Sequence, residues 1–198
     1  MKKLKFINSD MLKILAMIFM LLDHMWATII TGNQWMTNIG RLAFPIFAFL
    51  IVEGFTHTSD LKKYMKRLFI FGLISEIPFN LIYSGSVIFP FHQNVMFTLL
   101  LGLLSINAID KFKKNKNLKN FFKCFLKIIA YLLLGTILFV DYGATGIITV
   151  IVFYIFRNTK LEHLYQLISL ILLYIVFFKG QSIIIFHSKG DLSWQKSH

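Results

Sequence analysis

The chain of 198 residues has few charged residues, one cysteine and three prolines, and each scarcity excludes a class of protein. Charged residues make up 15% of the sequence, whereas soluble domains carry roughly a quarter, and 57% of the residues are hydrophobic. A chain of this composition cannot cover itself with polar surface, so lipid is its natural solvent. The single cysteine, Cys124, excludes an internal disulfide and a cysteine-rich metal site.

Several functional patterns are absent as well. The six histidines are scattered without the spacing of metal ligands, so we expect no metal site. Glycine-rich loops that bind nucleotide phosphates are not found either. Segments with period-two alternation are missing, which argues against barrel strands and in favour of helices. Without an internal repeat, a Pro-rich linker or a soluble region, residues 1–198 are expected to form one integral membrane domain.

Long apolar segments predict an all-α, polytopic transmembrane helical bundle. A run over 11–30 follows three lysines, as in a signal peptide, but it is too long and has no cleavage site. We therefore expect it to remain as an uncleaved first span. Some later segments are close to the lower length limit of a membrane helix. In all, about seven spans are predicted, over 11–31, 39–56, 67–83, 94–110, 120–140, 143–157 and 161–178.

Positive charge dominates the polar segments, with 21 Lys and Arg against nine Asp and Glu, for a net charge of +12. These cations form short blocks between apolar runs, a pattern typical of membrane topology rather than of nucleic-acid binding. The blocks occupy alternate connections, which predicts a cytoplasmic N-terminus and, for a bacterial chain, a location in the inner membrane. The blocks are Lys2–Lys5, Lys62–Arg67, Lys111–Lys119 and Arg157–Lys160.

Ionisable and amide side chains also occur inside the predicted spans, where they are costly and usually face a protein interior or a water-filled cavity. Glu76 and Asn80 are four residues apart, so they share one helical face. The topology predicts one group between mid-membrane and the outer surface, namely Asp23, His24, Arg41, Glu76, Asn80, Asn94 and Asp141. Tyr142 follows Asp141 in the tight fifth loop. A smaller group, Glu53 and His57, is predicted near the inner surface.

Asp23 beside His24 indicates general-base chemistry, because a carboxylate can orient an imidazole and raise its basicity. Adjacent helical residues point about 100° apart, so Glu76 is an alternative partner for His24. Other interpretations remain open at this point. Asp23 and His24 also fit an interfacial position without chemistry, and Arg41 fits a helix-end side chain that reaches for water. Glu53 and His57 also fit a solvated or structural role.

Several motifs in register resemble the TraX family. The first is the run 12–24, which ends in Leu22-Asp23-His24, and the second is Ile39-Gly40-Arg41-Leu42-Ala43-Phe44-Pro45. The resemblance covers roughly residues 11–157. It continues through Glu53-Gly54, His57-Thr58, Ser75-Glu76-Ile77-Pro78, Asn94-Val95-Met96-Phe97-Thr98 and Asp141-Tyr142-Gly143. Family members usually end with an aromatic-Pro-His element, whereas Phe186-His187 lacks the proline, so a divergent or truncated C-terminal end is expected.

The resemblance implies a membrane-bound N-acetyltransferase that takes acetyl from acetyl-CoA and modifies the N-terminal amine of a pilin-like protein or another surface acceptor. We expect His24 to act as base, Asp23 or Glu76 to orient it, and Arg41 to stabilise the oxyanion or hold an acceptor carboxylate. The other polar residues are expected to bind substrate: Asn80, Asn94, Asp141, Tyr142, Glu53 and His57. The basic Lys62–Arg67 block is expected to attract the phosphates of CoA.

The alternative from another class is a non-catalytic membrane protein, either a small transporter or an assembly or maturation partner for surface proteins. Intramembrane Asp, His, Arg and Glu would then line a substrate or proton path. A transporter more often has paired repeats and broken helices in matching halves, which the sequence does not show. Membrane lipids are expected as partners in either case, and nucleic acid is not.

Overall fold

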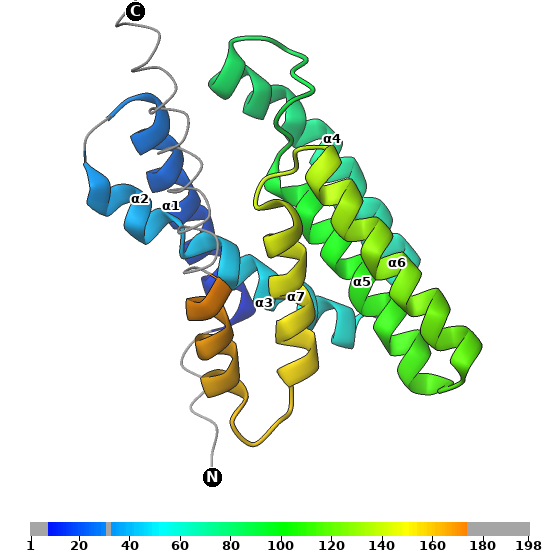
Figure 1. The fold of residues 1–198 in the computed structure, drawn as a ribbon. Coiled ribbons are helices and arrows are strands. Elements are labelled where there is room, and N and C mark those ends of the chain that lie inside the picture. Colours follow the sequence, from blue (N-terminus) through cyan, green and yellow to red (C-terminus); the bar gives the residue numbers. More distant parts are fainter. Residues whose placement is uncertain (1–7, 31–32, 174–198) are drawn as a thin grey trace, which may run out of the picture. The chain divides into compact units, whose positions relative to one another are not determined.

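The structure is a computed structural model that describes residues 8–30 and 33–173 of the chain. In those residues every regular element is a helix, which confirms the predicted all-α class (Figure 1). A further short helix, Glu162–Leu173, follows the labelled ones. The labelled helices are α1 Ser9–Thr28, α2 Gln34–Gly40, α3 Ala43–His57, α4 Leu61–Ser84, α5 Val95–Lys114, α6 Leu118–Ile137 and α7 Gly143–Phe156.

Four helical segments of the described chain are long and apolar enough to cross a membrane: α1, the combined Gln34–His57 segment, α5 and α6. Large apolar side chains on α1 and α6 face outward, among them Leu21 and Leu126, which are 59% and 63% exposed. A soluble protein would not expose apolar surface of this kind to water, whereas in a membrane lipid chains cover it. The chain is therefore a multi-pass membrane protein.

The helix boundaries follow local sequence signals. Asp60, Asn94 and Asn117 each accept a hydrogen bond from a backbone N–H in the first turn of the helix that follows, so they cap α4, α5 and α6. α4 ends at Gly85, whose φ of 69° lies in the left-handed region that glycine adopts without strain.

The predicted span over 39–56 is broken near its start. α2 ends at Gly40 and α3 begins at Ala43, so Arg41 and Leu42 form a turn between them. Pro45 lies in the first turn of α3, where a missing N–H removes no helical hydrogen bond. Pro78, in contrast, lies inside α4, which continues past it to Ser84.

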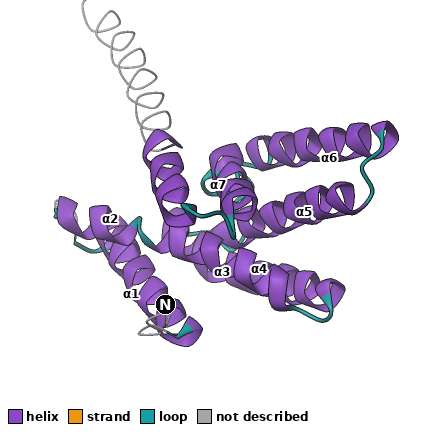
Figure 2. Cartoon of the chain, turned by 90° about the horizontal axis from the view of Figure 1, so that it is seen from below, coloured by secondary structure: helices purple, strands orange, loops and turns teal. Residues whose placement is uncertain are grey.

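α5 is the central helix of the core. It packs against α3, α4 and α6, and it runs side by side with α6 (Figure 2). Its buried apolar side chains include Leu99, Leu103 and Ile106. Gly102 lets α7 approach closely, because a Cβ at this position would lie 2.8 Å from Cβ of Val150. Small residues of this kind allow close helix contacts in membranes, where helix association depends on packing.

The chain groups into two compact units, residues 1–155 and 156–198. The second is described as far as residue 173. Within it the ring of Phe156 stacks on Tyr165 at 5.1 Å, and the N–H of Asn158 donates to Glu162 at 2.9 Å. Phe186-His187 and the end of the predicted 161–178 span lie outside the described residues.

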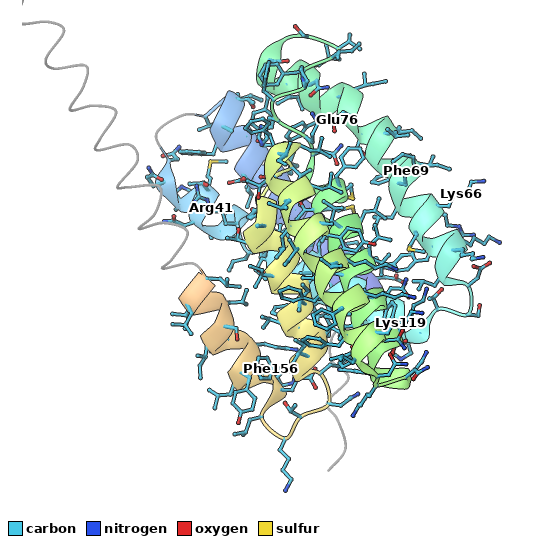
Figure 3. The ribbon with its side chains drawn as sticks, turned by 45° about the vertical axis from the view of Figure 1, so that its right-hand side comes forward. Arg41, Lys66, Phe69, Glu76, Lys119 and Phe156 are labelled. Carbon is cyan, nitrogen blue, oxygen red and sulfur yellow. The ribbon has the colours of Figure 1, made fainter. Side chains whose placement is uncertain are left out.

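The first unit has two chemically different ends. We call "polar end" the last turns of α1 and α4, the short helix α2 with Arg41 after it, and the connections 85–94 and 138–142. We call "basic end" the connections 58–60 and 115–117 with the helix turns beside them, which are rich in lysine. Figure 3 shows Glu76 in α4 toward the polar end and Lys119 at the basic end.

The close contact at Gly102 can be tested with Gly102→Ala. The added methyl group clashes with Val150, so we expect a loss of about 1–3 kcal/mol in the free energy of unfolding. Gly72→Ala is the matched control, because its Cβ would meet its nearest neighbour at an ordinary 3.4 Å. This control should be neutral or slightly stabilising, since alanine favours helix. Thermal unfolding in detergent, followed with a thiol-reactive dye at buried Cys124, measures both. Equal stability of the two variants would contradict the packing argument.

Candidate functional site

The polar end collects most of the predicted site residues from distant parts of the chain. Asp23 and His24 come from the last turns of α1, and Arg41 follows α2. Glu76 and Asn80 lie on the last turns of α4. Asn94, Asp141 and Tyr142 belong to the two connections 85–94 and 138–142.

Asp23 is held by α2. The hydroxyl of Thr37 donates to its Oδ1 at 2.7 Å, and Thr37 is only 3% exposed. One turn later, Gly40 lies directly against the backbone of α1, since a Cβ there would come within 2.6 Å of Asp23 Cβ. The carboxylate of Asp23 therefore has a fixed position and one oxygen already bound to a buried donor.

The ring of His24 is oriented by its own helix. Its Nδ1 lies 2.8 Å from the carbonyl oxygen of Met20, and a carbonyl can only accept, so Nδ1 carries a proton. In the neutral imidazole, Nε2 then has the free lone pair that a general base requires. The structure thus supplies the tautomer suited to base chemistry through a backbone carbonyl rather than through a carboxylate.

A chain of rings extends from His24 to the two polar connections. Tyr83 meets the His24 ring edge-on at 5.8 Å and the His92 ring at 5.5 Å. Phe79 packs against both Tyr83 and His92, at 4.7 and 5.0 Å. At its far side, Nε2 of His92 lies 3.9 Å from Oδ1 of Asp141. A second imidazole, this one close to a carboxylate, therefore belongs to this end of the bundle.

Glu76 binds Asn94. Its Oε2 accepts from the backbone N–H of Asn94 at 3.1 Å and from Nδ2 at 2.6 Å. The same Nδ2 group also donates to the carbonyl of Gly72 at 2.9 Å. The structure therefore places Glu76 in a link between α4 and the start of α5, and gives His24 its hydrogen bond to Met20 instead.

Two buried oxygens on α4 have no hydrogen-bond partner among the described residues. They are Oε1 of Glu76 and Oδ1 of Asn80, one turn further along the helix. The amide nitrogen of Asn80 donates to Val87 at 3.2 Å, so its orientation is set from the 85–94 connection. Because unpaired buried acceptors are costly, this part of the polar end favours a proton or a hydrogen-bond donor.

Asp141 and Tyr142 join the two connections to α3 and α5. Gln93 accepts a hydrogen bond from the N–H of Asp141 at 2.9 Å, and the hydroxyl of Thr98 donates to the Asp141 carbonyl. The Tyr142 ring stacks on buried Phe44 at 4.1 Å with an interplanar angle of 14°. Both residues are therefore anchored at the polar end by backbone and ring contacts.

The Tyr142 phenol interacts electrostatically with Asp23 on α1 and with Arg41 after α2. Burial raises the pKa of the Tyr142 phenol well above its usual range, and the negative charges of Asp141 and Asp23 raise it further. The positive charge of Arg41 acts in the opposite direction. Tyr142 is therefore a neutral hydrogen-bond donor at physiological pH, in the electrostatic neighbourhood of Asp23 and Arg41.

Glu53 and His57 form a separate group. Nδ1 of His57 lies 2.8 Å from the carbonyl of Glu53 and 3.7 Å from its carboxylate, and the His57 side chain is 71% exposed. Thirteen residues of α3 separate His57 from Phe44, a rise of roughly 20 Å. The structure therefore keeps these two residues apart from the polar-end group, as the sequence indicated.

Comparison with known proteins identifies the family of this chain. A family model described as TraX protein matches residues 8–188, which is most of the chain. The chain belongs to the TraX family. The match is longer than the 11–157 expected from the motifs, and it includes Phe186-His187.

Two curated relatives of this TraX-family chain share part of its length. The probable fimbrial assembly protein FimC, serogroup H1, of Dichelobacter nodosus is 36% identical over 110 residues, which is 50% of this chain and 45% of that protein. Protein TraX of Escherichia coli is 31% identical over 91 residues, which is 42% of this chain and 36% of that protein. The chain thus aligns with less than half of either relative. No solved structure matches it.

Sequence reasoning missed three residues that the TraX-family fold brings to the polar end: Thr37, Tyr83 and His92. His92 lies in a connection that carries no formal charge, so a search for charges inside spans passes over it. Thr37 and Tyr83 are ordinary in membrane helices, and only their contacts with Asp23 and His24 give them a role. The signal for His92 was its position two residues before the motif that begins at Asn94.

The Glu76–Asn94 link can be tested with Asn94→Ala. The substitution removes the α5 cap and one of the two donors to Oε2 of Glu76, so we expect a loss of about 2–4 kcal/mol in the free energy of unfolding. Asn117→Ala removes a similar cap at exposed α6 and should cost about 1 kcal/mol. Unfolding in detergent followed by circular dichroism provides the measurement. A smaller effect at Asn94 than at Asn117 would show that the link contributes little.

Proposed function

We propose that the chain is an integral membrane N-acetyltransferase that moves acetyl from acetyl-CoA to an amine of a pilin-like or other surface-exposed acceptor. The observation that carries the proposal is the His24 ring, held with Nδ1 protonated and Nε2 available, within a polar cluster of an otherwise apolar bundle. Membership of the TraX family and the pilus-related name of the Dichelobacter nodosus relative support the choice of acceptor.

Acetyl transfer to an amine needs a base, because a protonated amine is no nucleophile. In the proposed step, Nε2 of His24 takes the proton of the acceptor ammonium group. The free amine attacks the thioester carbonyl, so that a C–N bond forms and the C–S bond breaks. The CoA thiolate leaves and takes up the proton that the new amide nitrogen loses, and His24 releases its own proton to water, so that it is neutral again.

The charge that develops in this step has suitable neighbours. Negative charge on the thioester oxygen would be stabilised by Arg41 and by the neutral phenol of Tyr142. Positive charge on His24 would be stabilised by Asp23, which Thr37 holds in position. Of the two expected partners of His24, this proposal takes Asp23, since Glu76 joins α4 to the start of α5 through Asn94.

The two substrates would meet the protein at different ends in this proposal. The acceptor amine would approach the polar end, whose acidic residues Asp23, Glu76 and Asp141 favour a cationic group. The basic block Lys62–Arg67 at the other end of α4 would attract the CoA phosphates. Lys66 precedes Glu76 by ten residues, or about 15 Å along the helix, so the pantetheine arm would have to extend along the bundle.

His24→Gln tests the base. Glutamine cannot take up a proton, so acetyl transfer should fall by roughly 10²–10⁴-fold while the protein stays folded. Mass spectrometry of the N-termini of surface proteins would compare a deletion strain complemented with wild type, His24→Gln or His163→Gln. His163 is exposed and is not among the residues proposed to bind substrate or to act in the transfer, so its variant should restore the acetylated mass.

A second candidate is a non-catalytic role in assembly of surface fibres, which the name of the fimbrial relative favours. The same comparison separates the two. If deletion changes no N-terminal mass and no glycan, but reduces assembled fibres, then the acetyltransferase proposal fails and assembly is supported. If the acetyl mass disappears with His24→Gln, catalysis is supported.

A further inference from the structure

A pocket of about 240 Å³ lies between α5 and α6, at the basic end and away from the polar cluster. Its walls include Lys111 and Phe112 from α5, and Asn120, Lys123, Cys124 and Lys127 from α6. The α6 residues follow one another at helical spacing, so they form one continuous face toward α5. The pocket therefore combines three ammonium groups with an apolar floor.

The pocket lining contains no carboxylate that could neutralise these lysines. The neighbouring acid, Asp110, is directed elsewhere: it pairs with Lys114 at 2.8 Å and accepts from the Tyr154 hydroxyl at 3.1 Å. Within the described part of the chain, Lys111, Lys123 and Lys127 make no ion pair with an acidic side chain. Three clustered cations without a counter-charge favour an anionic ligand.

The position of Lys127 points to the membrane rather than the solution as the source of that anion. Lys127 lies nine residues after the start of α6, or about 14 Å along a helix that is apolar enough to span a bilayer. Lysines at this depth reach toward the headgroup layer with their flexible stems. A ligand bound by both Lys123 and Lys127 would therefore be in the interfacial region of the membrane.

The surface beside the pocket suits acyl chains. Phe122, Phe125 and Leu126 are exposed on α6, each by more than half of its surface. Phe121 extends this surface to the pocket wall, since its ring meets Phe112 at 5.8 Å. A phosphate group beside an apolar face is the chemical pattern of a phospholipid, and a soluble phosphate compound would leave that face unused.

We propose that the α5–α6 pocket binds the phosphate of an anionic phospholipid through Lys111, Lys123 and Lys127, with the acyl chains along the exposed face of α6. The bound lipid would neutralise the lysines and fix the depth of α6 in the membrane. The site is independent of the acetyl-transfer proposal, because it uses none of the polar-end residues.

Native mass spectrometry of the full chain in detergent tests this site. Phosphatidylglycerol should be retained on the wild-type protein in preference to zwitterionic phosphatidylcholine. The double variant Lys123→Gln/Lys127→Gln should bind phosphatidylglycerol about 30-fold more weakly, given the usual contribution of a lysine near an anionic bilayer. Lys123→Arg/Lys127→Arg keeps the charge and should retain the lipid. Lys62→Gln/Lys63→Gln is the matched control, because it removes the same charge at the basic end outside the pocket.

Three results would overturn the proposal. The first is equal retention of phosphatidylcholine by the wild-type protein, which decides the question even if the double variant does not fold. The second is equal weakening in the Lys62/Lys63 control, which would show a diffuse charge effect. The third is displacement of phosphatidylglycerol by CoA or inorganic phosphate at similar concentration, which would assign the pocket to a soluble phosphate.

Discussion

The architecture of the polar end depends on the side chain of Asn94. Its Nδ2 group binds Glu76 and the carbonyl of Gly72, while its Oδ1 accepts from Met96 and so begins α5. The backbone N–H adds a second bond to Glu76. One side chain thus fixes the end of α4, the start of the central helix and the position of a buried carboxylate. In the low dielectric of a membrane protein, each of these bonds is costly to lose.

Gln93, the neighbour of Asn94, connects the start of α5 to the 138–142 connection. The backbone of Gln93 pairs with Phe139 and Asp141, so the 138–142 connection is held against the start of α5. Tyr142 then stacks on Phe44, which brings α3 into the same assembly. α1 joins through small residues of α2 at Asp23 and through the contact of His24 with Tyr83. Groups more than a hundred residues apart in sequence share one environment because each connection is tied to the next.

The sequence predicts the helices and the two ends better than it predicts the contacts. Hydropathy and caps mark α5 and α6 to within a few residues, because apolar length and Asn at a helix start are local signals. The break between α2 and α3 at Arg41 and Leu42 was not predicted, since the apolar sequence on either side of it is typical of one continuous span. The hydrogen-bond partners of the site residues could not be predicted from the sequence either. Glu76 faces Asn94 because of how α4 packs on α5, and spacing along one helix contains no information on that packing. The role of His92 depends equally on the fold.

The polar end and the basic end differ in the sign of their charged side chains. Asp23, Glu76 and Asp141 lie at the polar end with Arg41, whereas lysines outnumber acids at the basic end, where Asp110 is already paired. Charges separated along a helix of low dielectric interact over the length of the bundle more strongly than they would in water. A cationic acceptor is therefore favoured at one end, and phosphate, whether of a lipid or of a donor, at the other. Each end would repel the other end's ligand, so in the proposed acetyl transfer the charge separation would decide which substrate meets which end.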